Sequence, residues 1–316
     1  MLRRNALILT ALTSVALLSA CGGSSDPHVL APAPTPDIVA VAQATPDLSI
    51  LVEAVVAAGL VDTLKSAGPF TVFAPTNAAF ASLLAELGVT KDQLLANKPL
   101  LTTVLTYHVL PARVASTAIP FGKAITTVQG SILKIDSVSG AVVITDGRNR
   151  TSKVVIADVA ASNGVVHVVD KVILPADKNI VQTAQALPQF SILVEAVVAA
   201  NLAGTLSGTG PFTVFAPTNT AFANLLTELG ITKAALLADT ALLTKVLTYH
   251  VVVGRVLKAD VPLNTAITTV QGDTFTVNAS LAITDQRGRS ANITGTDVLT
   301  SNGVIHVIDK VILPKP

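Results

Sequence analysis

The chain contains 316 residues with a formal net charge of +1, and half of its residues are hydrophobic while only 3% are aromatic. This length allows two domains that each bury a core without support from disulfides or metals. The near-neutral charge and the scarcity of aromatic side chains argue against nucleic-acid binding, which needs a basic surface or a platform on which bases stack.

The first 20 residues have the pattern of an export signal. Arg3 and Arg4 precede an apolar run over residues 6–18, which is too short to span a bilayer, and small residues then lead to Cys21. This pattern is similar to bacterial lipoprotein signals, in which the cysteine becomes the lipid-bearing first residue. Because Gly22 rather than Asp follows, the resemblance implies a membrane anchor at Cys21 in the outer membrane or cell surface of a Gram-negative bacterium. The alternative is an ordinary signal peptide with an incidental cysteine.

Beyond a linker rich in Pro, Ala and Ser, the chain is a tandem duplication. Tyr107 recurs 142 positions later as Tyr249, whereas His167 recurs 139 positions later as His306. The second copy has therefore lost three residues, near residues 137–140, where we expect a surface hairpin. A period of this length suits two complete domains in series. The predicted organisation is a signal peptide at 1–20, a linker at 21–36, a first domain at 37–175 and a second domain at 177–316.

Within each copy, an apolar helical pattern over residues 48–56 is followed by the stretch Thr71–Phe80, which recurs at 213–222 with one change. Its first three residues favour a strand, and Pro75 ends that strand because proline lacks an N–H. Thr76 or Asn77 then caps a helix. The apolar residues of this helix recur at the i, i+3, i+4 and i+7 positions, as Phe80, Leu83, Leu84 and Leu87.

Two further helical patterns lie at residues 90–97 and 100–106, and the sequence pattern changes after them. From there on, β-branched runs alternate with turn residues, at 125–128, 132–135, 142–145, 154–156 and 165–169. The dipeptide Asn163-Gly164 predicts a tight turn before the last strand, which we expect to be buried on both faces. Helices grouped before a run of antiparallel strands indicate an α+β fold.

Three motifs in order identify a family resemblance. They are Thr71–Asn77, Leu105–Val109 and Asn163–Asp170, and they recur at 213–219, 247–251 and 302–309. In content and spacing they resemble the fasciclin domain, also called FAS1. The resemblance implies two tandem fasciclin-like domains, each a β-sandwich or wedge flanked by several helices. It also implies a role in adhesion or matrix association, without catalysis.

The Tyr-His pairs are the candidate binding residues that this resemblance suggests. Animal relatives use the corresponding region in receptor contacts, which by position falls on Tyr107-His108 and Tyr249-His250. The alternative is structural, with a buried ring whose hydroxyl is hydrogen-bonded beside an equally satisfied histidine.

His167 and His306 are the remaining repeated histidines, and both are embedded in apolar strand sequence. An enzyme would need a nucleophile beside such a base, but no Gly-x-Ser-x-Gly motif accompanies them. A metal or small-ligand site could combine His108 with His167 and Asp170, although the usual spacing of metal ligands is lacking.

The sequence therefore predicts a non-enzymatic lipoprotein, without cofactor or metal, that binds a protein or matrix component of the cell surface through two linked domains. Since tryptophan is absent, a platform that stacks sugars is disfavoured. Two alternatives stay open. One is an envelope protein that binds a small ligand or metal through its paired histidines, and the other is a purely structural periplasmic lipoprotein.

Overall fold

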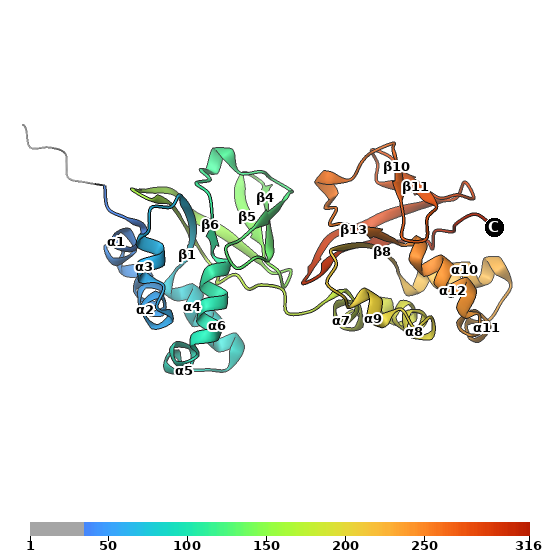
Figure 1. The fold of residues 1–316 in the computed structure, drawn as a ribbon, viewed down its shortest axis with the longest axis horizontal. Helices are drawn as coiled ribbons and strands as arrows, with labels where there is room; N and C mark the ends of the chain where they lie inside the picture. The colour runs from blue at the N-terminus through green and yellow to red at the C-terminus, as the bar shows by residue number, and fades with distance from the viewer. Residues whose placement is uncertain (1–34) are drawn as a thin grey trace, which may run out of the picture. The chain divides into compact units, whose positions relative to one another are not determined.

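The computed structural model describes residues 35–316, so the predicted signal peptide, Cys21 and nearly all of the predicted linker lie outside the described residues. Two seven-stranded sheets are present, one in each copy of the repeat (Figure 1). The strand order is β2-β1-β7-β6-β5-β4-β3 in the first domain and β9-β8-β14-β13-β12-β11-β10 in the second. Because the two orders match strand for strand, the duplication in sequence is a duplication of fold.

The first domain begins with helices and ends with strands, as predicted. Its helices are α1 (Ile38–Gln43), η1 (Pro46–Leu48), α2 (Ser49–Ala58), α3 (Val61–Lys65), α4 (Asn77–Leu87), α5 (Lys91–Ala96), α6 (Lys98–Tyr107) and η2 (Ser116–Ala118). Its strands are β1 (Phe70–Pro75), β2 (Val109–Leu110), β3 (Ala124–Thr126), β4 (Ile132–Val138), β5 (Ala141–Thr145), β6 (Thr151–Ala161) and β7 (Gly164–Val169).

The second domain repeats this order. Its helices are α7 (Ile180–Gln185), η3 (Pro188–Phe190), α8 (Ser191–Ala199), α9 (Ala203–Leu206), α10 (Asn219–Leu229), α11 (Lys233–Ala238), α12 (Thr240–Tyr249) and η4 (Lys258–Asp260). Its strands are β8 (Phe212–Pro217), β9 (Val251–Val253), β10 (Ala266–Thr268), β11 (Thr274–Val277), β12 (Ala282–Thr284), β13 (Ser290–Thr300) and β14 (Gly303–Ile308). Within residues 35–316, no helix combines the length and the apolar character that crossing a membrane requires.

The predicted strand-to-helix switch is present between β1 and α4. The Thr76 side chain accepts a hydrogen bond from the Ala79 N–H at 3.1 Å, which caps the helix, and Gly88 ends the helix in the left-handed conformation. The apolar stripe is narrower than predicted, since Phe80 and Leu83 are buried but Leu87 is 39% exposed. The last turn of α4 lies beyond the edge of the core, so its apolar side chain reaches solvent.

The strand pairing corrects the expectation of a purely antiparallel run. Strand β1 pairs in parallel with β7, from Phe70 opposite Gly164 to Pro75 opposite Val169. The intervening helices and strands form one long crossover, which makes the first and last strands of the domain neighbours within the sheet, next to the short edge strand β2. As predicted, β7 is buried on both faces.

Strand β6 is much longer than the predicted residues 154–156. Two register shifts, on either side of Ile156, interrupt its pairing with β7, and the strand continues to Ala161. Bulges of this kind bend a strand and increase its twist. They allow β6 to connect the β1-β7 half of the sheet with the β5-β4-β3 half. Its alanines and Asp158 have low strand propensity, which is why the periodic pattern missed this part.

The tight turn before β7 is present, but Gly164 is the first residue of the strand and not part of the turn. The two turn residues are Ser162 and Asn163, since Ala161 already pairs with Gly164. A Cβ atom on Gly164 would lie 2.2 Å from the Phe70 carbonyl oxygen, so glycine permits the close approach of β7 to β1. The Asn163 side chain accepts a hydrogen bond from the Ile38 N–H at 3.1 Å. Its amide group donates to two carbonyl groups at the end of α3, those of Leu64 and Ser66.

Replacing Gly164 by Ala should therefore destabilise the first domain by about 2 to 3 kcal/mol, because the added methyl group forces the neighbouring strands β1 and β7 apart. Urea denaturation monitored by circular dichroism would measure the loss. Gly204→Ala is the control, since no atom lies within 4 Å of its added Cβ. Equal stabilities of the two variants would contradict the close approach of the strands.

The three-residue deletion falls in the β4-β5 hairpin, as predicted. In the first domain, Ser139 and Gly140 form its turn with φ values of 51° and 82°. In the second domain the two strands of this hairpin are shorter, and the turn residues between β11 and β12 include Leu281 at a φ of 62°. The β4-β5 hairpin belongs to the part of the sheet that lies away from α1 and α2 (Figure 1), where a change of loop length leaves the core intact.

Candidate functional site

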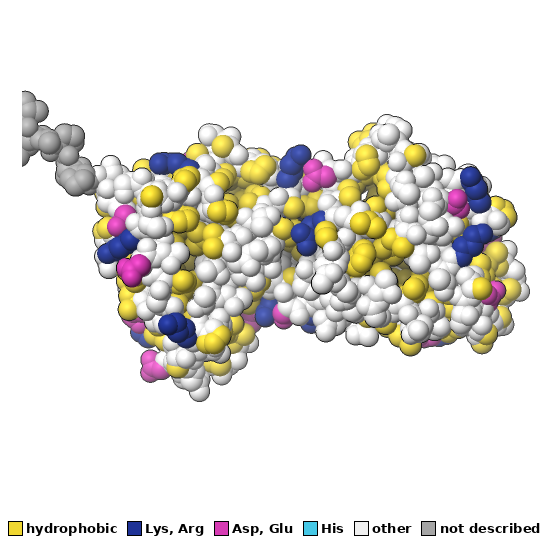
Figure 2. Space-filling model, in the orientation of Figure 1, with side chains coloured by type: hydrophobic (Ala, Val, Ile, Leu, Met, Phe, Trp, Pro, Cys, Tyr) yellow, Lys and Arg dark blue, Asp and Glu magenta, His cyan; other side chains and the backbone are white. Residues whose placement is uncertain are grey.

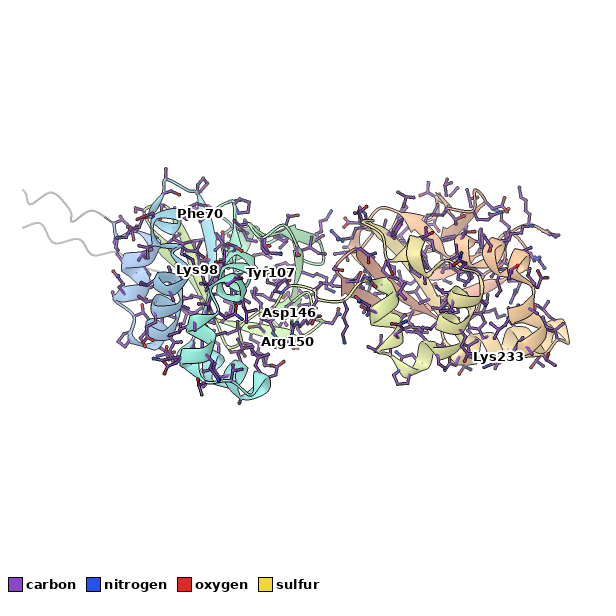
Figure 3. All side chains as sticks on the ribbon, turned by 60° about the horizontal axis from the view of Figure 1, so that its bottom comes forward. Phe70, Lys98, Tyr107, Asp146, Arg150 and Lys233 are labelled. Atoms are coloured by element: carbon purple, nitrogen blue, oxygen red, sulfur yellow. The ribbon has the colours of Figure 1, made fainter. Side chains whose placement is uncertain are left out.

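Tyr107 is the last residue of α6, and its side chain lies in the apolar core of the first domain (Figure 3). It is fully buried, and its hydroxyl donates to the Ile132 carbonyl at 2.7 Å while accepting the Gly147 N–H at 2.8 Å. Burial raises the pKa of the phenol well above its ordinary value, and the charge of nearby Asp146 adds to the rise. The hydroxyl thus joins two strand ends and is inaccessible to an external partner.

Tyr249 occupies the same place in the second domain but has a different partner set. Its hydroxyl donates to the Thr274 carbonyl at 2.8 Å, and the Gln286 side-chain amide donates to that same carbonyl. The ring packs edge-on against Phe275, with 6.1 Å between the ring centroids. Gln286 matches Gly147 in the repeat, so the second domain has added a side-chain donor at this point.

This difference predicts unequal effects of the same substitution. Tyr107→Phe leaves the Ile132 carbonyl and the Gly147 N–H without their hydroxyl partner, and should cost about 1 to 3 kcal/mol. Tyr249→Phe should cost less, because Gln286 still donates to the Thr274 carbonyl. Denaturant unfolding of both variants compares their losses of stability, and a larger loss for Tyr249→Phe would contradict the prediction.

The histidines that follow these tyrosines use both ring nitrogens. His108 Nδ1 lies 2.7 Å from the Val104 carbonyl oxygen, and Nε2 accepts the Ile173 N–H at 3.1 Å. These partners assign the proton to Nδ1. His250 has the same arrangement with Val246 and Ile312. Burial lowers the pKa of His108 and of His250 to about 4, so both rings are neutral at pH 7.

His167 and His306, on β7 and β14, have the opposite tautomer. His167 Nε2 donates to the Val114 carbonyl at 2.9 Å, and its Nδ1 accepts the Asp158 N–H at 3.2 Å. The ring stacks on Phe73 with 5.8 Å between centroids. His306 repeats these contacts with the Val256 carbonyl and the Asp297 N–H, and burial lowers its pKa. Each ring therefore connects a bulged strand to the segment before a 3-10 helix.

The combination of His108, His167 and Asp170 does not form a metal site. All four ring nitrogens already have protein partners, and the Asp170 carboxylate accepts the Lys153 N–H at 2.7 Å. Across residues 35–316, no three His, Cys, Asp or Glu side chains converge as a metal site would require. The expectation of a ligand set built on paired histidines therefore has no geometric support.

A buried carboxylate beside Tyr107 escaped the sequence analysis. Asp146 is 1% exposed and accepts the backbone N–H groups of Arg148, Arg150 and Leu174, each at 2.9 Å. The Arg150 guanidinium forms an ion pair with Asp146 (Figure 3). It also contacts the Glu86 carboxylate on α4, at 2.8 Å. The signal was the pattern Asp-x-Arg-x-Arg, which both copies retain at 146–150 and 285–289 within an otherwise divergent region.

The helical half of each domain contains a small apolar cavity. In the first domain it measures about 60 Å³ and lies between α1, α2, α3 and β1, with Ile38, Leu51 and Phe70 among its lining residues. The matching cavity of the second domain measures about 30 Å³. Their walls are almost wholly carbon, so neither cavity offers converging polar groups that would orient a substrate for catalysis.

Comparison with known proteins places these features in a family. The fasciclin domain model matches residues 46–175 and 188–314. Pig transforming growth factor-beta-induced protein ig-h3 is 33% identical over 253 residues, which cover 79% of this chain and 35% of that protein. Human periostin is 29% identical over 262 residues, which cover 81% of this chain and 29% of periostin. This chain thus spans about a third of these two relatives.

Two further similarities concern single domains and the domain pair. An uncharacterized protein of Synechocystis is 42% identical over 139 residues, which cover 44% of this chain and 98% of that protein. The solved FAS1 domain pair of the insect cell adhesion molecule fasciclin I covers 84% of this chain and 97% of its own, with 19% identity and a TM-score of 0.41. Because the family model matches both copies of the repeat, the chain belongs to the fasciclin domain family.

Proposed function

We propose that this protein is a non-enzymatic adhesion protein that binds a protein or matrix component of a cell surface through its two fasciclin domains. Family membership of both domains supports the class of function. The buried, fully hydrogen-bonded tyrosines and histidines argue against the Tyr-His pairs as direct contacts, since a partner would have to unfold α6 to reach them. Recognition then depends on surface side chains.

The observation that carries this proposal is a set of exposed apolar residues that both domains share. Val56 is 59% exposed and its counterpart Val198 is 60% exposed. Three further pairs are exposed at matched positions: Leu87 and Leu229, Phe121 and Leu263, and Val128 and Val270. On the face that Figure 2 shows, apolar side chains are spread over both domains, charged groups are few and no histidine is visible. Such a surface suits a protein partner better than a charged polymer.

Adhesion assays with the purified protein test the proposal. The protein should retain cells or matrix proteins on a coated surface, and Val56→Ser with Val198→Ser should weaken this retention. Val253→Ser is the control, because Val253 is 72% exposed but Pro111 occupies the matched position of the first domain. Two weak sites in one chain act together, so each single substitution should reduce retention less than the pair.

A protein that binds neither cells nor matrix would refute the adhesion proposal. Loss of binding in the Val253 variant alone would refute the proposed surface instead. Deletion of the gene should also reduce surface attachment and aggregation of the cells that make the protein.

The cellular location is a second part of this proposal and depends on the N-terminal sequence. We propose that Cys21 carries lipid and holds the domains at the outer membrane or cell surface. Radiolabelled palmitate should enter the protein, and Cys21→Ala should abolish its incorporation. Protease treatment of intact cells should remove the domains if they face outward, whereas protection would place them in the periplasm.

A further inference from the structure

A buried ion pair joins the two domains. Lys134 on β4 of the first domain contacts Asp297 on β13 of the second, with 3.0 Å between Nζ and Oδ2. The side chains are only 13% and 3% exposed, unlike the Lys91–Glu53 pair, whose side chains are 41% and 46% exposed. Lys134 also contacts Asp136 of its own strand at 3.1 Å. A charge this well shielded from water is costly without its partner, so the pair favours one particular arrangement.

A second contact lies beside this ion pair. The Asn149 side chain donates to the Leu299 carbonyl at 3.0 Å and accepts the Leu299 N–H at 2.6 Å. An apolar cluster accompanies these bonds, in which Ile132 of the first domain packs with Leu257, Leu299 and Val304 of the second. Polar pairing with fixed geometry and apolar burial together are what a specific interface requires.

We propose that the two fasciclin domains dock on each other in solution through this interface. The surface of the second domain around Asp297 is the docking surface, and its occupant is the surface of the first domain formed by Ile132, Lys134 and Asn149. The residues that carry this proposal are independent of those proposed to bind an adhesion partner. Adhesion would therefore act through a pair of domains with one fixed spacing.

Among residues 35–316 the interface is not repeated in full, because each of its two surfaces differs at key positions in the other domain. The positions that match Lys134 and Asn149 in the second domain are Thr276 and Gly288, which have neither the charge nor the amide. On the opposite side, the exposed Ala160 of the first domain matches the buried Leu299 of the second. A head-to-tail interface that recurred on both domains would continue from molecule to molecule into fibres. Because the two copies differ at these positions, docking within one chain leaves no second Lys134–Asn149 surface to which a further molecule could add.

Asp158 is the residue of the first domain that matches Asp297, and no other domain docks against it in the part of the chain that the structure describes. Both residues have positive φ values and accept the first N–H of a 3-10 helix, from Ser116 and Lys258 respectively. Asp158 nevertheless remains exposed. The local fold alone therefore leaves this carboxylate in solvent, and the burial of Asp297 comes from the first domain.

Residues can be exchanged between matched positions of the two domains, because each residue is already accommodated at that position in one of them. Lys134→Thr with Asn149→Gly gives the first domain the residues that the second domain has at these positions. Distances are measured by electron paramagnetic resonance between spin labels in the full chain carrying Cys21→Ser, Lys91→Cys and Lys233→Cys. These lysines are 41% and 45% exposed and lie one in each domain. The control is the reverse exchange, Thr276→Lys with Gly288→Asn, at exposed positions of the second domain.

The protein with an intact interface should show one narrow distance peak. The Lys134→Thr, Asn149→Gly variant should lose this peak to a broad distribution, with an unchanged circular dichroism spectrum, and the control should keep it. A broad distribution with the intact interface would overturn the proposal, as would a narrow peak that persists in the variant. Should the double variant lose its fold, Lys134→Thr alone answers the same question by the same criteria. Broadening in the control would also overturn it, because the effect would then not depend on these contacts.

Discussion

Acidification from pH 7 to pH 4 is expected to lower the stability of each domain by about 3 kcal/mol through one buried histidine. The pKa values of His108 and His250 are lowered from 6.5 to about 4, chiefly by burial. The unfolded chain therefore takes up a proton near pH 6.5, whereas the folded domain resists protonation until about pH 4. The stabilising contribution is complete above pH 6.5 and is lost progressively as the pH falls to about 4.

Urea denaturation at pH 7, 5.5 and 4 measures this loss as a fall in the free energy of unfolding. His108→Gln isolates the contribution of the first domain, since this variant should be less stable at pH 7 but should lose less stability on acidification. Nuclear magnetic resonance titration provides a direct check of the group itself. A His108 ring signal in the folded protein that titrates near pH 6.5 would contradict the assignment.

Phe80→Ala is expected to destabilise the first domain by about 3 to 5 kcal/mol. Phe80 is 2% exposed and belongs to the core between the helices and the sheet. Truncation removes the apolar contacts of the ring and leaves a cavity, because a closely packed core relaxes only partly around a missing side chain. Thermal and urea unfolding would measure the loss, and Phe222→Ala should have a similar effect in the second domain.

Phe121→Ala is the matched control for this prediction. Phe121 is 43% exposed, so its removal should change the stability of the first domain far less than removal of Phe80. A Phe80→Ala protein with an unchanged melting temperature would contradict the position of this ring in the core. Equal losses for the two variants would show instead that the Phe121 ring is buried by contacts that the domain surface does not reveal.

Much of the fold could be predicted because its signals are local. The α+β class and the two tandem fasciclin-like domains are confirmed, and they rested on motifs that each occur twice. The cap at Thr76 and the end of α4 at Gly88 depend only on neighbouring backbone groups, so a few residues specify them. Burial of β7 was predictable from its apolar run for the same reason.

The candidate site was less accessible to prediction. The motifs located the Tyr-His pairs, but the hydrogen-bond partners of Tyr107 are Ile132 and Gly147, which are 25 and 40 positions away. Whether a histidine is a free ligand or a satisfied core residue depends on such partners, which no local pattern reveals. Asp146 was missed because an aspartate followed by glycine and two arginines is typical of a solvated turn in sequence, whereas the tertiary structure buries its carboxylate.

The sequence by itself determined the duplication, the order of helices before strands and the strand-to-helix switch, because these follow from periodicity, capping and turn chemistry within short segments. Only the tertiary structure decided the parallel pairing of β1 with β7, the reason for Gly164 and the burial of Asp297 by Lys134. Each of these depends on groups separated by about 90 to 160 positions, and their contact is created by the closure of the whole fold.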